Sequence, residues 1–305
     1  MKRLILLCVI FSIAITSSIC QTTSSTPKVR SEMLVSTAWL AEHLHDSNVV
    51  ILHVTDDRKD FEKRHIPGAR FVPMDRLTYS DGASGTMGMI EKDLPSVDKL
   101  QKLFSELGVA DGSHVILYAT NWFPNAARGY FTLDYLGHGD KTSLLDGGME
   151  QWLNEKRPVE SGESKSTHTN FTPHVHPEVL ALLEDVKKMT EEKTASGHAL
   201  IVDSRPHKRY TDGHLTGAVS LYWKDTLVSE KSPLLLPPEK LRQMLTARGI
   251  APGVKIVTYC EVGLQASHGY FLAKYLGYDA AMYDGSIHEW DMINNLPLAK
   301  GESKK

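Results

Sequence analysis

An internal repeat constrains the fold of this chain more than any other feature of its sequence. The two halves of the 305 residues carry the same motifs in the same order. Gly-Tyr-Phe triplets start at Gly129 and at Gly269, and each is followed by an Asp-Gly dipeptide, at Asp146 and at Asp284. A tandem repeat of one domain is the most economical explanation.

Each half is predicted to be a doubly wound α/β domain. Four short runs are apolar throughout, as expected of parallel strands covered on both faces: 49–54, 115–118, 200–203 and 254–259. Helical patterns separate these runs at 98–107, 127–136 and 238–248. The alternation of strands and helices predicts a parallel sheet in each half, with the ligand site beyond the carboxyl ends of its strands.

A linker joins the two halves. Residues 158–177 are rich in Ser, Thr, His and Pro and have no apolar period. We therefore predict one domain over 33–157 and a second over 178–300. Within the linker, Asn170 heads an Asn-Phe-Thr acceptor sequence for N-glycosylation, which requires an exposed loop in a secreted protein.

The first twenty residues are predicted to be a secretory signal peptide. Lys2 and Arg3 precede a nearly unbroken apolar stretch over 4–15, and small residues follow up to Cys20. The stretch is short for a transmembrane helix, and an uncleaved anchor remains the alternative. We expect the protein to be secreted, or to reside in the secretory pathway, without a membrane partner.

The cysteine count points to a single thiol of interest. Only three cysteines exist, and two of them, Cys8 and Cys20, lie in the predicted signal peptide. The remaining one, Cys260, is then a buried inert thiol, an intermolecular bridge or a reactive thiol. The net charge of −3 provides no basic field, so nucleic acid is not expected as a partner.

The surroundings of Cys260 favour the reactive thiol. A predicted strand ends directly on it, the loop Glu261, Val262, Gly263, Leu264 and Gln265 follows, and a helical pattern opens near residue 266. Backbone N–H groups and the helix dipole should then stabilise the thiolate and lower the pKa of the cysteine. The glycine should let the chain turn tightly around the sulfur.

Together these motifs resemble the two-domain sulfurtransferases, the rhodanese and 3-mercaptopyruvate sulfurtransferase group, over residues 33–300. They are Val-Asp-Ser-Arg, Gly-His-Leu-Thr-Gly-Ala, the cysteine loop and Tyr-Asp-Gly-Ser, in that order. The resemblance implies an α/β fold of two tandem rhodanese-like domains. It also implies an inactive first domain, which has Ala119-Thr120 where the second has Cys260. The implied reaction moves a sulfane sulfur from 3-mercaptopyruvate or thiosulfate to a thiol, thioredoxin-like or cyanide acceptor through a Cys260 persulfide. It implies no cofactor and no metal.

The resemblance also assigns roles to arginines. Arg205 and Arg209 match family residues that hold the anionic donor, and a guanidinium suits a carboxylate geometrically. The alternative for Arg205 is a structural ion pair with Asp203, two residues earlier. Arg128 matches a family contact between the two domains.

This chain departs from the family in the loop. Loops of the form Cys-Arg-Lys-Gly accompany thiosulfate in that family, and Cys-Gly-Ser/Thr-Gly loops accompany mercaptopyruvate, whereas this loop is Cys-Glu-Val-Gly. Glu261 should raise the cysteine pKa and repel a dianion unless its carboxylate turns to solvent, and Val262 lacks the hydroxyl. His53 stands where a family Asp is expected, while His65 and His214 are expected to brace loops by hydrogen bonds.

Two other functions are compatible with parts of the sequence. A cysteine phosphatase needs an Arg six positions after the nucleophile, where this chain has Ala266. The stronger alternative is a secreted, catalytically weakened binding or scaffold protein of the same fold, which the altered loop supports.

Overall fold

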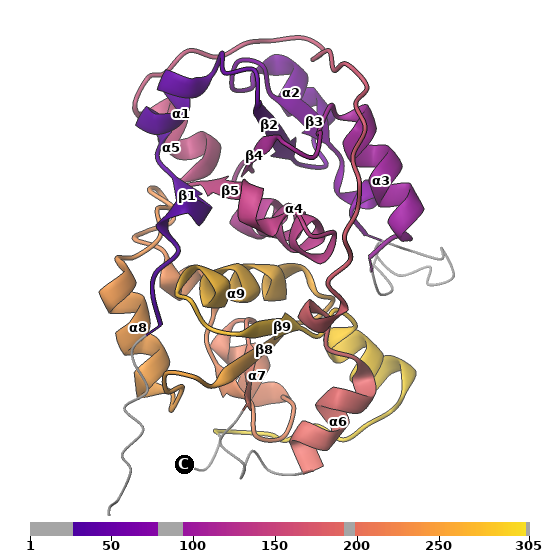
Figure 1. Ribbon diagram of the computed structural model, residues 1–305. Coiled ribbons are helices and arrows are strands. Elements are labelled where there is room, and N and C mark those ends of the chain that lie inside the picture. Colours follow the sequence, from indigo (N-terminus) through magenta and orange to yellow (C-terminus); the bar gives the residue numbers. More distant parts are fainter. Residues whose placement is uncertain (1–26, 79–93, 192–198, 303–305) are drawn as a thin grey trace, which may run out of the picture.

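The computed structural model describes residues 27–78, 94–191 and 199–302, so the predicted signal peptide lies outside the described residues. These residues form two α/β domains, one above the other in Figure 1. Each domain holds one sheet with helices on both of its faces, as the repeat predicts.

Both sheets are parallel throughout. In the first, the strand order is β1 (Leu34–Val35), β5 (Thr142–Leu145), β4 (His114–Tyr118), β2 (Val49–Val54) and β3 (Arg70–Val72). In the second, it is β7 (Val219–Ser220), β6 (Ala199–Asp203), β8 (Lys255–Tyr259) and β9 (Ala280–Met282). All four predicted strands are present as β2, β4, β6 and β8, and their side chains are largely buried, since helices cover both faces.

The helices connect the strands of each sheet. They are α1 (Thr37–His43), α2 (Arg58–Lys63), α3 (Val97–Glu106), α4 (Phe123–Tyr135), α5 (Gly148–Asn154), α6 (Leu183–Glu191), α7 (His207–Asp212), α8 (Pro238–Ala247) and α9 (Leu264–Tyr275). Two begin earlier than predicted. In α4 the proline of the first turn, Pro124, needs no backbone hydrogen bond there, and α9 starts directly after Gly263, which adopts a left-handed φ of 81°.

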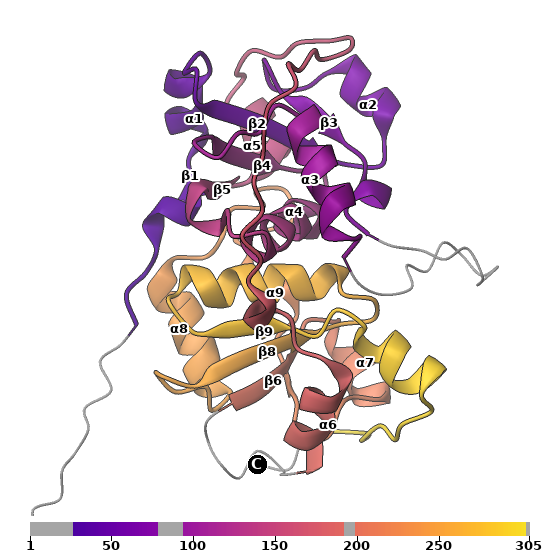
Figure 2. The ribbon, with the colours of Figure 1, turned by 45° about the vertical axis from the view of Figure 1, so that its right-hand side comes forward.

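The repeated Gly-Tyr-Phe triplets meet where the domains pack. Helices α4 and α9 lie side by side between the two sheets (Figures 1 and 2). Tyr130 packs edge-on against Phe271, and Phe131 packs edge-on against Tyr270, with both pairs of ring centroids 5.1 Å apart. The contact is thus reciprocal, so the repeat builds the interdomain interface as well as each domain.

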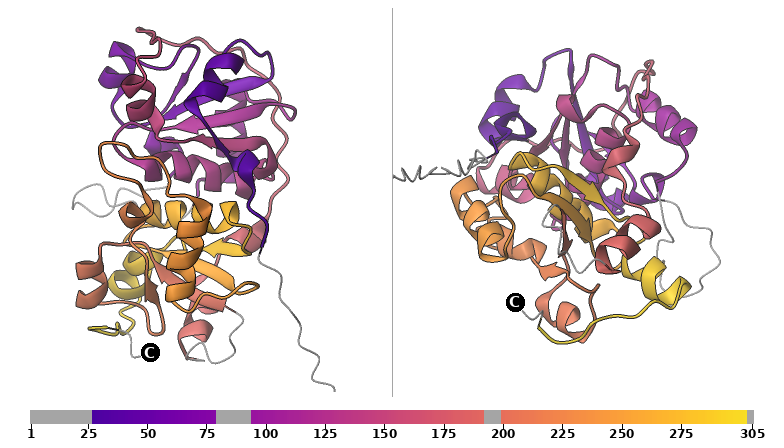
Figure 3. Two further views of the ribbon diagram at one scale, coloured as in Figure 1. Left: turned by 90° about the vertical axis from the view of Figure 1, so that its left-hand side faces the viewer. Right: turned by 60° about the horizontal axis from the view of Figure 1, so that its bottom comes forward.

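The predicted linker is an extended segment that lies against the first domain (Figures 1 and 3). The Phe171 side chain is buried in that domain, 5.7 Å from the ring of Phe104 between centroids. The neighbouring Asn170 is exposed, as a glycosylation acceptor must be.

Candidate active site

The carboxyl ends of β6 and β8 bring the predicted site residues to one edge of the second sheet. Asp203, the last residue of β6, pairs in register with Tyr259, the last residue of β8. The Tyr259 hydroxyl donates to the Asp203 carboxylate at 2.7 Å, and Cys260 follows immediately. The site therefore lies where a doubly wound sheet is expected to place one.

Three backbone N–H groups surround the sulfur of Cys260. They belong to Val262, Gln265 and Ala266, and each hydrogen-bonds the sulfur. Gly263 makes this possible, because a side chain at its φ of 81° would be strained and its Cβ would lie 2.1 Å from an Asp284 carboxylate oxygen. The predicted cradle of amides is confirmed. Leu264 and Gln265, however, belong to the first turn of α9 rather than to a loop.

The predicted direction of the cysteine pKa is wrong. Burial raises the pKa of the Cys260 thiol, whose residue is only 1% exposed, and the charge of Asp203 raises it further. The three amides act in the lowering direction but are outweighed, since desolvation disfavours the charged thiolate. Burial therefore favours the neutral thiol form of Cys260 over the thiolate.

Ser286 organises the loop, and the sequence analysis did not identify it. Its buried hydroxyl accepts hydrogen bonds from the backbone N–H groups of Cys260, at 3.0 Å, and Gly263, at 3.1 Å, and donates to the carbonyl of Tyr283 at 2.9 Å. The residue adopts a left-handed φ of 51°, which is rare for a side chain other than glycine. The first half has Gly148, with a φ of 55°, at the matching place, and that difference within the repeat was the available signal.

A buried ion pair fixes the loop to the first domain. Arg128, on α4, donates to both carboxylate oxygens of Asp284, at 2.5 and 2.9 Å, and both side chains are 2% exposed. The same arginine donates from Nε to the carbonyl of Leu77. The expected interdomain contact of Arg128 is confirmed.

Arg205 and Glu261 meet at the site, whereas Arg209 lies exposed on α7. Arg205 donates to both oxygens of Asp203 and to the carbonyl of Gly213, and its Nη1 lies 3.2 Å from the Glu261 carboxylate. The structural ion pair considered for Arg205 is therefore present. Donor binding by the two arginines remains a prediction.

The histidines have structural contacts. The imidazoles of His65 and His214 each hydrogen-bond a backbone carbonyl four residues earlier, and each stacks on the aromatic ring of that residue. Their predicted bracing role is confirmed. His53 stacks on Tyr118 and hydrogen-bonds the Thr120 hydroxyl, and burial lowers its pKa to about 3, so the imidazole is neutral.

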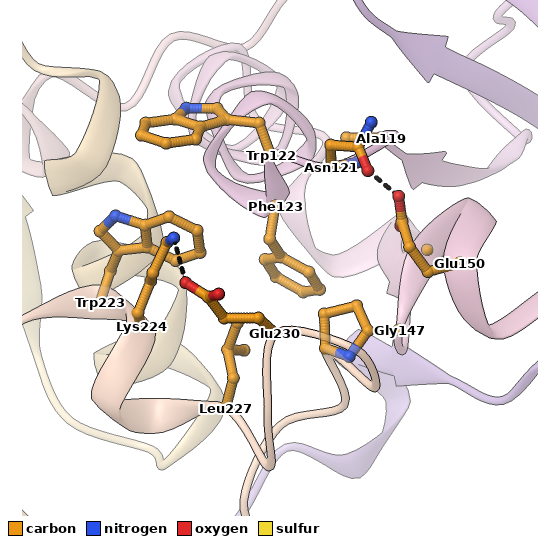
Figure 4. A pocket seen from close by; sticks show the side chains of 12 residues that line it. Ala119, Asn121, Trp122, Phe123, Gly147, Glu150, Trp223, Lys224, Leu227 and Glu230 are labelled. Carbon is orange, nitrogen blue, oxygen red and sulfur yellow. Dashed lines mark hydrogen bonds and ion pairs between the residues drawn. The ribbon is translucent and has the colours of Figure 1, made fainter.

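The first domain keeps the shape of this site without its thiol. The Ala119 carbonyl accepts from the N–H of Met149, as the Cys260 carbonyl accepts from the N–H of Ile287. A cavity of about 80 Å³ lies there, lined by Trp122 and Phe123 of this domain and by Trp223 and the Lys224–Glu230 ion pair of the second (Figure 4). The first domain therefore has a pocket at the matching place, but Ala119 stands there instead of a cysteine.

No helix within residues 27–78, 94–191 and 199–302 is both long and apolar enough to cross a membrane.

The fold and the site define a two-domain α/β protein with one thiol held at a helix N-terminus. A rhodanese-like domain profile matches residues 36–155 and again 182–292. The sulfur carrier protein TtuD of Thermus thermophilus is 30% identical over 292 residues, covering 89% of this chain and 98% of that protein. Human 3-mercaptopyruvate sulfurtransferase is 30% identical over 281 residues, covering 85% and 92%.

A solved structure agrees with these relatives. SseA of Escherichia coli, described as having the rhodanese fold and as a 3-mercaptopyruvate enzyme, superposes with a TM-score of 0.71 at 27% identity, covering 83% of this chain and 98% of SseA. The chain belongs to the two-domain rhodanese-like family of sulfurtransferases.

Proposed function

We propose that this sulfurtransferase carries sulfur as a persulfide on Cys260, taking it from 3-mercaptopyruvate in preference to thiosulfate. The acceptor is a small thiol, a thioredoxin-like dithiol or cyanide. The observation that carries the proposal is the cradle of three amides around the Cys260 sulfur, because those donors stabilise negative charge on a thiolate or on a persulfide.

Sulfur transfer from mercaptopyruvate begins at Cys260. The Cys260 thiol first gives up its proton to water, and the resulting thiolate attacks the donor sulfur. The donor carbon–sulfur bond breaks, and its electron pair leaves on the enolate of pyruvate. A proton then passes to that enolate, which leaves pyruvate and the persulfide. With thiosulfate, the sulfur–sulfur bond breaks and sulfite leaves instead. An acceptor thiolate or cyanide attacks the outer sulfur and regenerates Cys260.

The negative charges beside Arg205 support the preference for mercaptopyruvate over thiosulfate. Thiosulfate is a dianion, and Asp203 and Glu261 both lie next to Arg205. A donor with a single carboxylate meets less repulsion there. The missing loop hydroxyl, replaced by Val262, is expected to slow proton delivery to the leaving enolate.

Steady-state kinetics with the two donors tests this function. The expected result is a higher kcat/KM for mercaptopyruvate than for thiosulfate, and no transfer by Cys260→Ser, whose hydroxyl cannot supply a thiolate. A higher kcat/KM for thiosulfate would overturn the donor assignment. Retained turnover in Cys260→Ser would overturn the mechanism.

The second candidate is a secreted binding or scaffold protein with weakened chemistry. Two observations favour it: burial raises the pKa of Cys260, and Glu261 occupies Arg205. Absence of turnover with both donors, in a protein that is folded by circular dichroism, is the result this candidate predicts.

We also place the protein in the secretory pathway, on the apolar N-terminal segment and the exposed Asn170. Expression in secretory cells should release a chain shortened by about 20 residues. An N-glycosidase should increase the gel mobility of that chain but leave the mobility of Asn170→Gln unchanged. A full-length chain retained in the cytosol would contradict the placement.

A further inference from the structure

The Arg205 guanidinium is already surrounded by anions before any donor binds. Its Nε and Nη2 donate to the Asp203 carboxylate at distances down to 2.7 Å, and Nη2 also donates to the carbonyl of Gly213 at 2.6 Å. Its Nη1 donates to the Glu261 carboxylate at 3.2 Å. Two carboxylates therefore face one guanidinium, so the cluster carries a net negative charge.

The two carboxylates differ in how firmly they are held. The Asp203 side chain is fully buried and accepts further hydrogen bonds from the Tyr259 hydroxyl and the Arg205 backbone N–H. The Glu261 side chain is 41% exposed, whereas the Arg205 side chain is only 5% exposed. Glu261 can therefore rotate into water at small cost, while Asp203 and Arg205 must stay together.

The Glu261 carboxylate lies against the Arg205 guanidinium. After desolvation by burial, the charge of Asp203 also raises the pKa of the Cys260 thiol. The pKa of the Arg205 guanidinium is raised against the lowering effect of burial, chiefly by Asp203 and also by the charge of Glu261. The Glu261 side chain thus reaches the guanidinium nitrogen that Asp203 leaves accessible.

We propose that Glu261 is an internal anion that occupies Arg205 and thereby sets donor selectivity. An anionic donor reaches Arg205 only by displacing the Glu261 carboxylate into solvent, and a dianion does so less readily than a monocarboxylate. Uncharged reagents reach Cys260 without that displacement. This inference deepens the proposed function, because it rests on the sulfur donor being the displacing anion.

Alkylation of Cys260 by two reagents of similar shape and different charge tests the proposal without requiring sulfur transfer. Iodoacetate is anionic and iodoacetamide is neutral, and the rate of each at Cys260 is measured by mass spectrometry of the peptide that contains it. In Glu261→Gln, the ratio of the iodoacetate rate to the iodoacetamide rate should rise roughly 5- to 10-fold, since the competing carboxylate is gone. Glu184→Gln, an exposed substitution on α6 with the same charge change, should leave the ratio unchanged within about twofold.

Two further measurements test the route through Arg205. In an Arg205→Gln background, the Glu261→Gln effect should vanish. Because Arg205→Gln leaves Asp203 without its counter-ion and can unfold the domain, sulfate protection provides a second measurement with Arg205 intact. Sulfate should slow iodoacetamide alkylation at roughly 5- to 10-fold lower concentration in Glu261→Gln than in the unsubstituted protein.

An unchanged reagent ratio or an unchanged sulfate concentration in Glu261→Gln overturns the proposal. An equal rise in the Arg205→Gln background also overturns it, because Glu261 would then repel anions without Arg205. Absence of turnover with every donor, by contrast, refutes the proposed function and leaves the alkylation ratio readable.

Discussion

Removing the Ser286 hydroxyl should destabilise the protein through the loop that holds Cys260. Ser286→Ala leaves the buried N–H groups of Cys260 and Gly263 without their acceptor. A buried donor left without a partner costs about 1–3 kcal/mol, so the loss of two predicts a fall of about 2–6 kcal/mol in the free energy of unfolding. Urea denaturation measures this change.

Ser286→Gly is the matched variant, because it removes the same hydroxyl and relieves the backbone. At a φ of 51°, glycine is favoured over alanine by roughly 1 kcal/mol, so Ser286→Gly should be more stable than Ser286→Ala by about that amount. A free energy of unfolding of Ser286→Ala within about 0.5 kcal/mol of that of the unsubstituted protein would show that the hydroxyl does not hold the loop. A glycine variant less stable than the alanine variant would show that the backbone at residue 286 is not strained.

Three further predictions concern the ion pair, the thiol and the exposed arginine. Asp284→Asn leaves the buried Arg128 without a counter-ion and should lower the free energy of unfolding by about 3–5 kcal/mol, and with it the melting temperature. Asp212→Asn, at an exposed ion pair, is the control and should not change the melting temperature. Equal shifts of the melting temperature in the two variants would contradict this. Burial raises the pKa of Cys260, so the folded protein favours the neutral thiol. The pH at which iodoacetamide alkylation becomes half-maximal should therefore be higher in the native protein than in urea. An equal or lower native value would show that the stabilising effect of the three amides on the thiolate outweighs burial. The native stability linked to this thiol should be present below its unfolded pKa and be lost as the pH rises through the folded pKa. Arg209→Ala should raise the KM for mercaptopyruvate more than it slows iodoacetamide alkylation, and an unchanged KM would remove Arg209 from the donor site.

The strands and the site edge could be predicted because their signals are local. An apolar run such as 200–203 identifies a buried parallel strand, and the residue after such a strand lies at the ligand edge. Cys260 was placed in this way, and Gly263 was recognised because a tight turn around the sulfur needs a glycine.

The features that the sequence did not predict depend on residues that are far apart in the chain. The pKa of Cys260 follows from how completely the folded chain removes water from the thiol, and the local pattern shows only the amides that oppose this effect. Ser286 accepts from a loop 26 residues earlier, and Glu261 reaches Arg205 across 56 residues. Only the folded sheet edge brings these groups together.

The mass of the Cys260 peptide after incubation with a sulfur donor is the most direct test of persulfide formation on Cys260. The protein is exposed to mercaptopyruvate or thiosulfate without an acceptor, and the peptide that contains Cys260 is analysed by mass spectrometry. The expected result is a mass gain of one sulfur atom on that peptide, which a thiol acceptor removes and which Cys260→Ser does not show. An unmodified Cys260 with both donors would contradict it.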